Sequence, residues 1–190
     1  IAINTTIKIN FCYFFFFAFF ASFSATIFDN SILSFYGRRD NHNTASKNNT
    51  YKLSYIQTIN NFKFGVSNAT GLRNPTLYEL FGSNNYGYKG DINLKAEKSR
   101  TNEIFGSYDL FDNLTLKSTA YRTTFLDRLE FNSGFTATEN KQIDLSNEGL
   151  ESELIYEGQN QKFSTFTTFS KSKTEKGASQ QRRPDLNYGA

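Results

Sequence analysis

Residues 71–99 read GLRNPTLYELFGSNNYGYKGDINLKAEKS, and this stretch decides how the rest of the chain is interpreted. It opens with GLRNPTLYELFG, from Gly71 to Gly82, and closes with GDINLKAEKS, from Gly90 to Ser99. Glycine, proline and asparagine are frequent in it, as they are in turns and loops. The sequence on either side alternates in the manner of β-strands. The stretch is therefore predicted to be a long connection between two strands.

The composition favours an all-β protein. Phenylalanine (21) and tyrosine (11) are abundant, tryptophan and methionine are absent, and only 2 prolines occur. Aromatic residues alternate with threonine, serine and asparagine, which is typical of strands. With 38% hydrophobic residues and a mean hydropathy of −0.53, the chain is too polar for a helical membrane protein. A membrane β-barrel remains compatible, because only alternate residues of its strands face lipid.

Several functions lack support. The net charge is +3, but the basic residues are interleaved with acidic ones, so nucleic-acid binding is not predicted. The single Cys12 cannot form an internal disulfide, and the lone His42 cannot form a histidine metal cluster or a catalytic histidine pair. No metal and no cofactor is therefore predicted.

From Ser31 onward, strands of suitable length alternate with connections of two lengths. The expected strands are Ser31–Arg39, Thr50–Thr58, Phe62–Thr70, Arg100–Leu110, Leu114–Phe125, Gln142–Glu157, Phe163–Lys173 and the opening of another at Leu186. The long connections are Asp40–Asn49, Gly71–Ser99, Leu126–Lys141 and Thr174–Asp185, and the short ones are Ile59–Asn61, Phe111–Asn113 and Gly158–Lys162. Strict alternation of long and short predicts an antiparallel up-and-down meander with every long loop on one side.

Side-chain alternation predicts two chemically different faces. Tyr51, Leu53 and Tyr55 share one face, opposite Lys52 and Ser54. Phe62, Phe64 and Val66 oppose Lys63, Gly65 and Ser67, and Leu150, Leu154 and Tyr156 oppose Glu151, Glu153 and Glu157. A water-filled or plugged lumen tolerates such charges, whereas the core of a β-sandwich would not.

The two ends of residues 71–99 resemble paired signatures of TonB-dependent outer-membrane receptors, especially the cobalamin and siderophore receptors. The first is G-[FY]-R-A-P-[TS]-L-x-E-L-[FY]-G and the second is G-N-P-N-L-x-P-E-x-S. Both stand here in order, with departures at Leu72, Asn74, Ile92 and Ala96. Further resemblances lie at residues 37–42, 121–131, 147–153 and 182–184, which read GRRDNH, YRTTFLDRLEF, NEGLESE and RRP.

The resemblance implies a partial transmembrane β-barrel, with about eight of an expected 22 strands. Such a receptor contacts outer-membrane lipid and carries a plug domain through which the TonB complex acts. Neither the plug nor the terminal aromatic strand of a complete barrel is evident here, so the chain is interpreted as a fragment from the C-terminal half of the barrel. The implied location is the cell outer membrane. The implied function is energised uptake of cobalamin or a ferric siderophore, with no catalytic residues.

Residues 1–28 differ from residues 29–190, which form the predicted partial barrel. Phe11 to Phe23 is a thirteen-residue run with eight phenylalanines, flanked by Lys8 and by Ser24. This outline resembles a secretory signal segment, and a translation artefact is an equal alternative. A helical or disordered segment is expected, and a barrel strand ranks third because the run does not alternate.

Two alternatives to the receptor stay open. A barrel hydrolase would need a nucleophile or an activated water; Asp127, Glu130 and Asp144 are better interpreted as solvated loop carboxylates. A small outer-membrane pore or adhesin without TonB coupling would need the eight strands to close by themselves.

Ligand contact is predicted in the loop of residues 71–99, the longest connection. Tyr86 and Tyr88 are the candidate ligand-binding residues, because aromatic faces suit large rings and chelates. Tyr78, Leu80 and Phe81 are expected to be structural anchors against the barrel wall.

Overall fold

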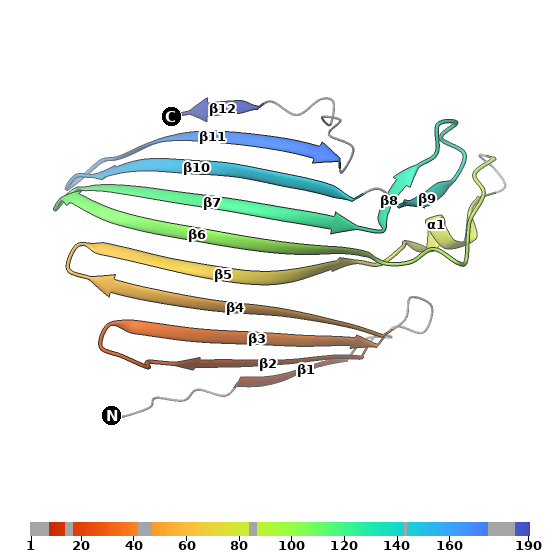
Figure 1. Cartoon of the computed structure of the whole chain (residues 1–190), viewed down its shortest axis with the longest axis horizontal. Coiled ribbons are helices and arrows are strands. Elements are labelled where there is room, and N and C mark those ends of the chain that lie inside the picture. The colour runs from red at the N-terminus through yellow and green to blue at the C-terminus, as the bar shows by residue number, and fades with distance from the viewer. Residues whose placement is uncertain (1–7, 14–16, 42–46, 84–86, 143, 175–184) are drawn as a thin grey trace.

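A computed structural model of the chain describes residues 8–13, 17–41, 47–83, 87–142, 144–174 and 185–190. These residues form a ten-stranded antiparallel sheet, a separate two-stranded hairpin and one short helix (Figure 1). The strands of the large sheet are β1 (Lys8–Tyr13), β2 (Phe17–Ala25), β3 (Ser31–Asn41), β4 (Lys47–Ile59), β5 (Phe62–Arg73), β6 (Glu97–Phe111), β7 (Leu114–Leu126), β10 (Leu145–Glu157), β11 (Lys162–Thr174) and β12 (Leu186–Gly189). The helix is α1 (Leu77–Phe81), and the hairpin joins β8 (Arg128–Phe131) to β9 (Thr138–Lys141).

The sheet is the predicted up-and-down meander. Its strands follow chain order, with β7 pairing directly with β10 because the β8–β9 hairpin stands outside the sheet. The tight turns after β4, β6 and β10 lie at one end, and the strand ends that carry the four long connections lie at the other (Figure 1). The first of these turns is closed by Asn60, whose φ of 51° is a conformation that asparagine tolerates. The prediction that the long loops share one side is confirmed.

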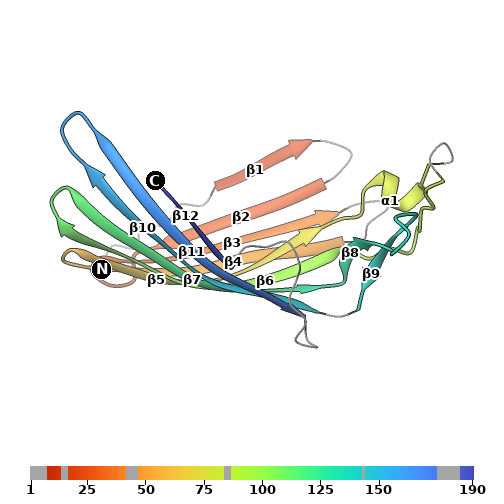
Figure 2. The ribbon, with the colours of Figure 1, turned by 90° about the horizontal axis from the view of Figure 1, so that it is seen from above.

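The sheet is curved and open. Among the described residues, β1 and β12 form its two edges and each has one neighbouring strand (Figure 2). A sheet taken from a wide barrel has this shape, because its curvature is too shallow to close over so few strands. The closed small barrel that a pore or adhesin would need is not formed by these strands.

The expectation of a helical or disordered N-terminal segment is wrong for the described residues of that region. Phe17–Ala25 is β2, which pairs with β3 along its whole length, and Lys8–Tyr13 pairs with β2. Backbone hydrogen bonds to β3 hold β2 even though its phenylalanines do not alternate strictly. The Ser24 and Ser34 hydroxyls add a hydrogen bond of 2.9 Å across the pair. Whether residues 1–28 act as a signal segment stays a prediction.

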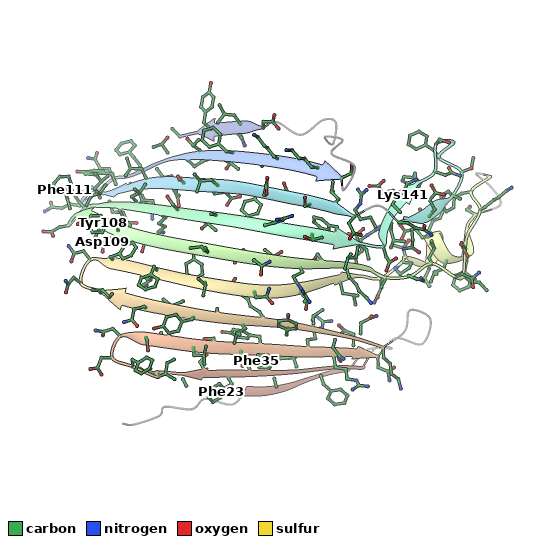
Figure 3. All side chains as sticks on the ribbon, in the orientation of Figure 1. Phe23, Phe35, Tyr108, Asp109, Phe111 and Lys141 are labelled. Carbon is green, nitrogen blue, oxygen red and sulfur yellow. The ribbon has the colours of Figure 1, made fainter. Side chains whose placement is uncertain are left out.

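The register gives the sheet two distinct faces, because directly opposite residues of a ladder point to the same side. Phe23 lies opposite Phe35, and both belong to the side that we call the apolar face (Figure 3). Its larger members are Phe19, Phe23, Leu33, Phe35, Leu53, Tyr55, Phe62, Phe64, Val66, Ile104, Tyr108, Leu116, Leu150, Leu154, Tyr156, Phe163 and Phe169. The other side, the polar face, includes Lys52, Lys63, Ser67, Glu103, Lys117, Glu151, Glu153 and Lys162. The predicted alternation is confirmed.

The apolar face is exposed rather than covered by other elements. Ile104 is 66% exposed and Phe169 is 52% exposed. A continuous exposed apolar surface of this kind needs a non-aqueous neighbour. In a membrane barrel that neighbour is lipid, and the polar face lines the lumen. No helix among the described residues is long and apolar enough to cross a membrane.

Candidate functional site at the loop end

The motif stretch of residues 71–99 folds into a compact unit beyond the loop end of β5 and β6. Pro75 precedes the helix, and Thr76 caps it. The Glu79 backbone N–H donates to the Thr76 hydroxyl at 3.2 Å, and the Thr76 N–H donates to the Glu79 carboxylate at 2.7 Å. This reciprocal capping box stabilises a helix that is too short to persist by itself. The capping box therefore gives the T-L-x-E-L order of residues 76–80 a local structural role at the start of the helix.

An ion-pair network attaches the helix to the barrel. The Arg73 guanidinium lies 2.7 Å from a Glu79 carboxylate oxygen and 3.9 Å from a Glu97 oxygen. Arg73 ends β5 and Glu97 begins β6, so the network joins both strands to α1. Glu97 makes a second contact: its carboxylate accepts a hydrogen bond from the Leu129 backbone N–H at 3.0 Å. The loop unit is thereby fixed to the strand ends and to the β8–β9 hairpin.

The environment of Glu79 favours its charged form. Burial by itself raises the pKa of this carboxyl group. The backbone N–H and hydroxyl of Thr76 and the guanidinium of Arg73 outweigh burial, so the pKa of Glu79 lies below its ordinary value. Glu79 is therefore an ionised, structural carboxylate at neutral pH.

The two loops pack against each other through a small apolar core. Leu80 of α1, Leu94 of the motif stretch and Leu129 of β8 form one buried cluster. Asn140 of β9 ties the same elements together: its side-chain amide accepts from the Lys95 N–H at 2.8 Å and donates to the Lys95 carbonyl at 2.9 Å. Residues 71–99 and the β8–β9 hairpin thus form one loop cluster. The sequence predicted both as loops without secondary structure.

Tyr88 lies at the centre of this cluster. It is 6% exposed, and its hydroxyl lies 2.5 Å from the Thr138 hydroxyl. Its ring stacks on Tyr78 with centroids 4.2 Å apart and meets Phe131 edge-on at 6.0 Å. Tyr88 is therefore an anchor between the two loops. The sequence predicted this role for Tyr78, Leu80 and Phe81 instead. Tyr86, the other predicted contact residue, lies outside the described residues.

The predicted anchors behave differently from one another. Leu80 is buried, as expected, at 3% exposure. Tyr78 and Phe81 present aromatic surface to the outside instead, with Phe81 63% exposed. We use the name aromatic rim for the exposed apolar side chains of α1 and the β8–β9 hairpin, which are Leu77, Tyr78, Phe81, Phe131 and Phe135. The sequence did not predict that Phe131 and Phe135 belong to this surface. Residues 128–141 carry no local pattern that indicates that their hairpin packs against Tyr88.

A cavity of about 510 Å³ opens beside the cluster, at the loop end of β3, β4 and β5. Its lining includes the Arg38–Asp40 ion pair and Asn74. The side-chain oxygen of Asn74 is buried and has no hydrogen-bond partner within the described structure. Asn74 stands where the resembled signature has alanine, so this acceptor is a feature of this chain. Four carboxylates of the cluster are engaged in ion pairs: Glu79, Glu97, Glu130 and Glu139. Within the described part of the chain, no group of His, Cys, Asp and Glu could hold a metal ion.

Comparison with solved structures supports the fold. The siderophore receptor PirA from Pseudomonas aeruginosa matches with a TM-score of 0.74 and 21% identity, covering 83% of this chain and 32% of that one. The copper transporter OprC matches with a TM-score of 0.70 and 15% identity, covering 91% and 31%. The ferric-catecholate import receptor Fiu from E. coli K12 matches with a TM-score of 0.68 and 15% identity, again covering 91% and 31%. The chain thus spans about a third of the length of these receptors.

Sequence comparison identifies the family. A comparison with curated proteins returned no match. The family model for the TonB-dependent receptor-like β-barrel matches residues 13–189, which is nearly the whole chain and includes β2. Members of this family are outer-membrane transport receptors rather than enzymes. The described strands and both motif signatures agree with that match, and the chain belongs to the TonB-dependent receptor β-barrel family.

Proposed function

We propose that this chain is the barrel segment of a receptor that captures a ferric siderophore at its extracellular loops and imports it with energy from the TonB complex. The observation that carries the proposal is the aromatic rim, held on a loop cluster with its own core and ion-pair network. Exposed aromatic side chains on a rigid support suit a large, partly aromatic chelate, because little conformational entropy is lost on binding. Cobalamin, another large ring system, is the alternative ligand.

Two further features support uptake rather than adhesion. The polar face carries charges of both signs, which suits a lumen occupied by a polar plug domain and contacts with it. Two of the similar solved structures are described as receptors for siderophores or ferric catecholates, and a third as a copper transporter. The coupling to TonB is proposed to run through the plug of the intact receptor.

Within this proposal the tyrosines have separate roles. Tyr78 and Phe81 contact ligand directly, and buried Tyr88 supports them from below through its stacking on Tyr78. Tyr86 is also proposed to contact ligand, because it is an aromatic residue in the same loop of residues 71–99. The unpartnered Asn74 oxygen offers a polar contact at the cavity beside the rim.

The test replaces Phe81 and Phe135 with alanine in the intact receptor and measures binding of a ferric catecholate siderophore and of cobalamin, together with surface display. Loss of two exposed aromatic contacts is expected to weaken binding by about 10- to 100-fold, at about 1–3 kcal/mol in total, with display unchanged. Ile92→Ala is the matched control, because Ile92 is an equally exposed loop side chain outside the rim. Normal display with unchanged siderophore affinity would refute the rim as the contact surface. A loss of cobalamin binding instead would favour the alternative ligand.

A further inference from the structure

The apolar face changes character along its strands. Among the described strands, the half of the apolar face that lies nearest the tight turns carries no charged residue. The half nearest the long loops carries charge, and the charged residues there are Arg39, Lys47, Lys98, Arg100, Arg122, Glu148, Lys171 and Lys173. All of them are exposed. We call the basic residues of this set the basic belt, with Glu148 as the acidic exception.

The positive charge of the belt is only partly balanced, because Glu148 is the one acid among the described residues of this half of the apolar face. Glu148 lies opposite both Arg122 and Lys171 in the register, yet none of the ion pairs formed by described residues includes a member of the belt. The polar face differs, because acids such as Glu103 and bases such as Lys117 alternate there. The excess of positive over negative charge is thus specific to the outward side of the sheet.

The belt begins where the apolar band ends. The last apolar row across the strands is Val66, Ile104, Ala120, Leu150 and Phe169. The next row of the same face is Asn68, Asn102, Arg122, Glu148 and Lys171. Two residues along a strand span about 7 Å, so the first charges lie close above the hydrocarbon boundary, at the height of lipid headgroups. The long loops are extracellular in such barrels, so these headgroups belong to the outer leaflet.

A groove concentrates part of the belt. It has a volume of about 580 Å³. Its lining includes the cationic side chains Lys47, Lys98 and Arg100, the hydroxyls of Thr70 and Thr124, and the apolar Leu72 and Leu126. Three cations with two hydroxyl donors suit a phosphate group, and the leucines suit the adjacent apolar part of a lipid.

The groove has a structural origin in the sheet. The β4–β5 ladder ends at the pair Lys52–Ala69, whereas β5 stays paired with β6 as far as Arg73–Glu97. Beyond its last pair with β5, β4 contacts that strand through Tyr51, whose N–H donates to the Thr70 hydroxyl at 2.9 Å and whose hydroxyl donates to the Asn68 side-chain oxygen at 2.8 Å. The groove therefore lies where β4 separates from β5, on the outward side of the barrel.

We propose that this groove and the basic belt bind the phosphate groups of anionic lipid headgroups in the outer leaflet. Lys47, Lys98 and Arg100 hold a headgroup phosphate in the groove, and Arg122, Lys171 and Lys173 extend the contact along the barrel wall. The interaction is independent of which ligand the receptor transports, because it involves the outward side and not the aromatic rim.

The test uses the intact receptor, purified in a zwitterionic detergent, and titrates it with diphosphoryl lipid A, with phosphatidylcholine and with inorganic phosphate. The groove variant Lys47→Gln/Lys98→Gln/Arg100→Gln is compared with the lumen variant Lys52→Gln/Lys63→Gln/Lys117→Gln, which removes the same charge from the opposite face. At about fivefold per cation, the groove variant is expected to bind lipid A about 100-fold more weakly. The lumen variant is expected to bind as the unmodified receptor does.

Three results would overturn the proposal: equal affinity of the groove variant, equal loss in the lumen variant, or inorganic phosphate binding as tightly as lipid A. If the triple groove variant does not fold, Lys98→Gln and Lys63→Gln give the same comparison, with about a fivefold loss expected for the first alone. Binding by the unmodified receptor is also expected to weaken in about 0.5 M salt, because the contacts are exposed and screened.

Discussion

Gly82 and Gly90, one from each half of the signature, lie backbone to backbone. A β-carbon on Gly90 would stand 2.4 Å from the Gly82 amide nitrogen and 2.5 Å from the Leu80 carbonyl oxygen. Gly82 itself ends α1 with φ of 73°, a left-handed conformation that favours glycine. The two glycines therefore let the end of α1 and the return of the loop touch, and this contact positions Tyr88 in the cluster.

Replacing Gly90 with alanine is expected to open the loop cluster. The added carbon would meet backbone atoms, which cannot give way as a side chain can, and overpacking of this kind costs about 1–3 kcal/mol. Limited proteolysis of the intact receptor should then cleave residues 71–99 faster, with the barrel still folded. Gly134→Ala is the control, because its nearest atom would be at 3.6 Å. Equal cleavage of both variants would contradict the packing role of Gly90.

The hydrogen bond between Tyr88 and Thr138 should be measurable by a double-mutant cycle. Tyr88→Phe leaves the ring stack intact and removes the hydroxyl, so it is expected to destabilise the cluster by about 1 kcal/mol. Adding Thr138→Val should cost less than the sum of the two single changes, because both act on one contact. Hydrogen exchange at the Lys89 N–H, which donates to the Thr136 carbonyl at 2.7 Å, reports on cluster opening. Strictly additive effects would show that the two hydroxyls do not interact.

Acid is expected to loosen the loop cluster through Glu79. The pKa of Glu79 is lower in the folded protein than its unfolded value of about 4.3, so its contribution is full above that value and is lost as the pH falls through the folded pKa. Protease sensitivity of the loop should therefore rise as the pH falls below about 4.3. Glu79→Gln should remove most of this pH dependence, whereas Glu139→Gln, in the exposed part of the hairpin, should leave it in place. A pH dependence unchanged by Glu79→Gln would assign it to another group.

The 190-residue chain alone is not expected to be a stable soluble monomer. Its apolar face would meet water, and the outer strands β1 and β12 would offer unpaired edges for association. Size-exclusion chromatography in detergent-free buffer should show aggregates, and detergent should reduce them. A monodisperse protein with a cooperative melt in that buffer would contradict the assignment of the exposed face to lipid.

The sequence by itself determined the meander, the side on which the long loops lie and the identity of the two faces. These properties depend on local patterns: the two-residue period of Phe62, Phe64 and Val66, and the turn residues such as Asn60 that separate the strands. Such patterns are readable because neighbouring residues of a strand must point to opposite sides. The order of the two glycine-containing signatures was likewise sufficient to indicate the family.

Only the tertiary structure decided the rest, because the deciding contacts join residues that are far apart in the chain. Tyr88 is buried against the hairpin and forms a hydrogen bond with Thr138, which lies 50 positions away in the chain. Residues 17–25 are a strand because β3 supplies the backbone partners, which a phenylalanine run does not reveal. Lys47 and Arg100 line one groove only because β4 separates from β5 at that height. Burial, pairing and charge clustering are properties of the assembled sheet, and no local pattern encodes them.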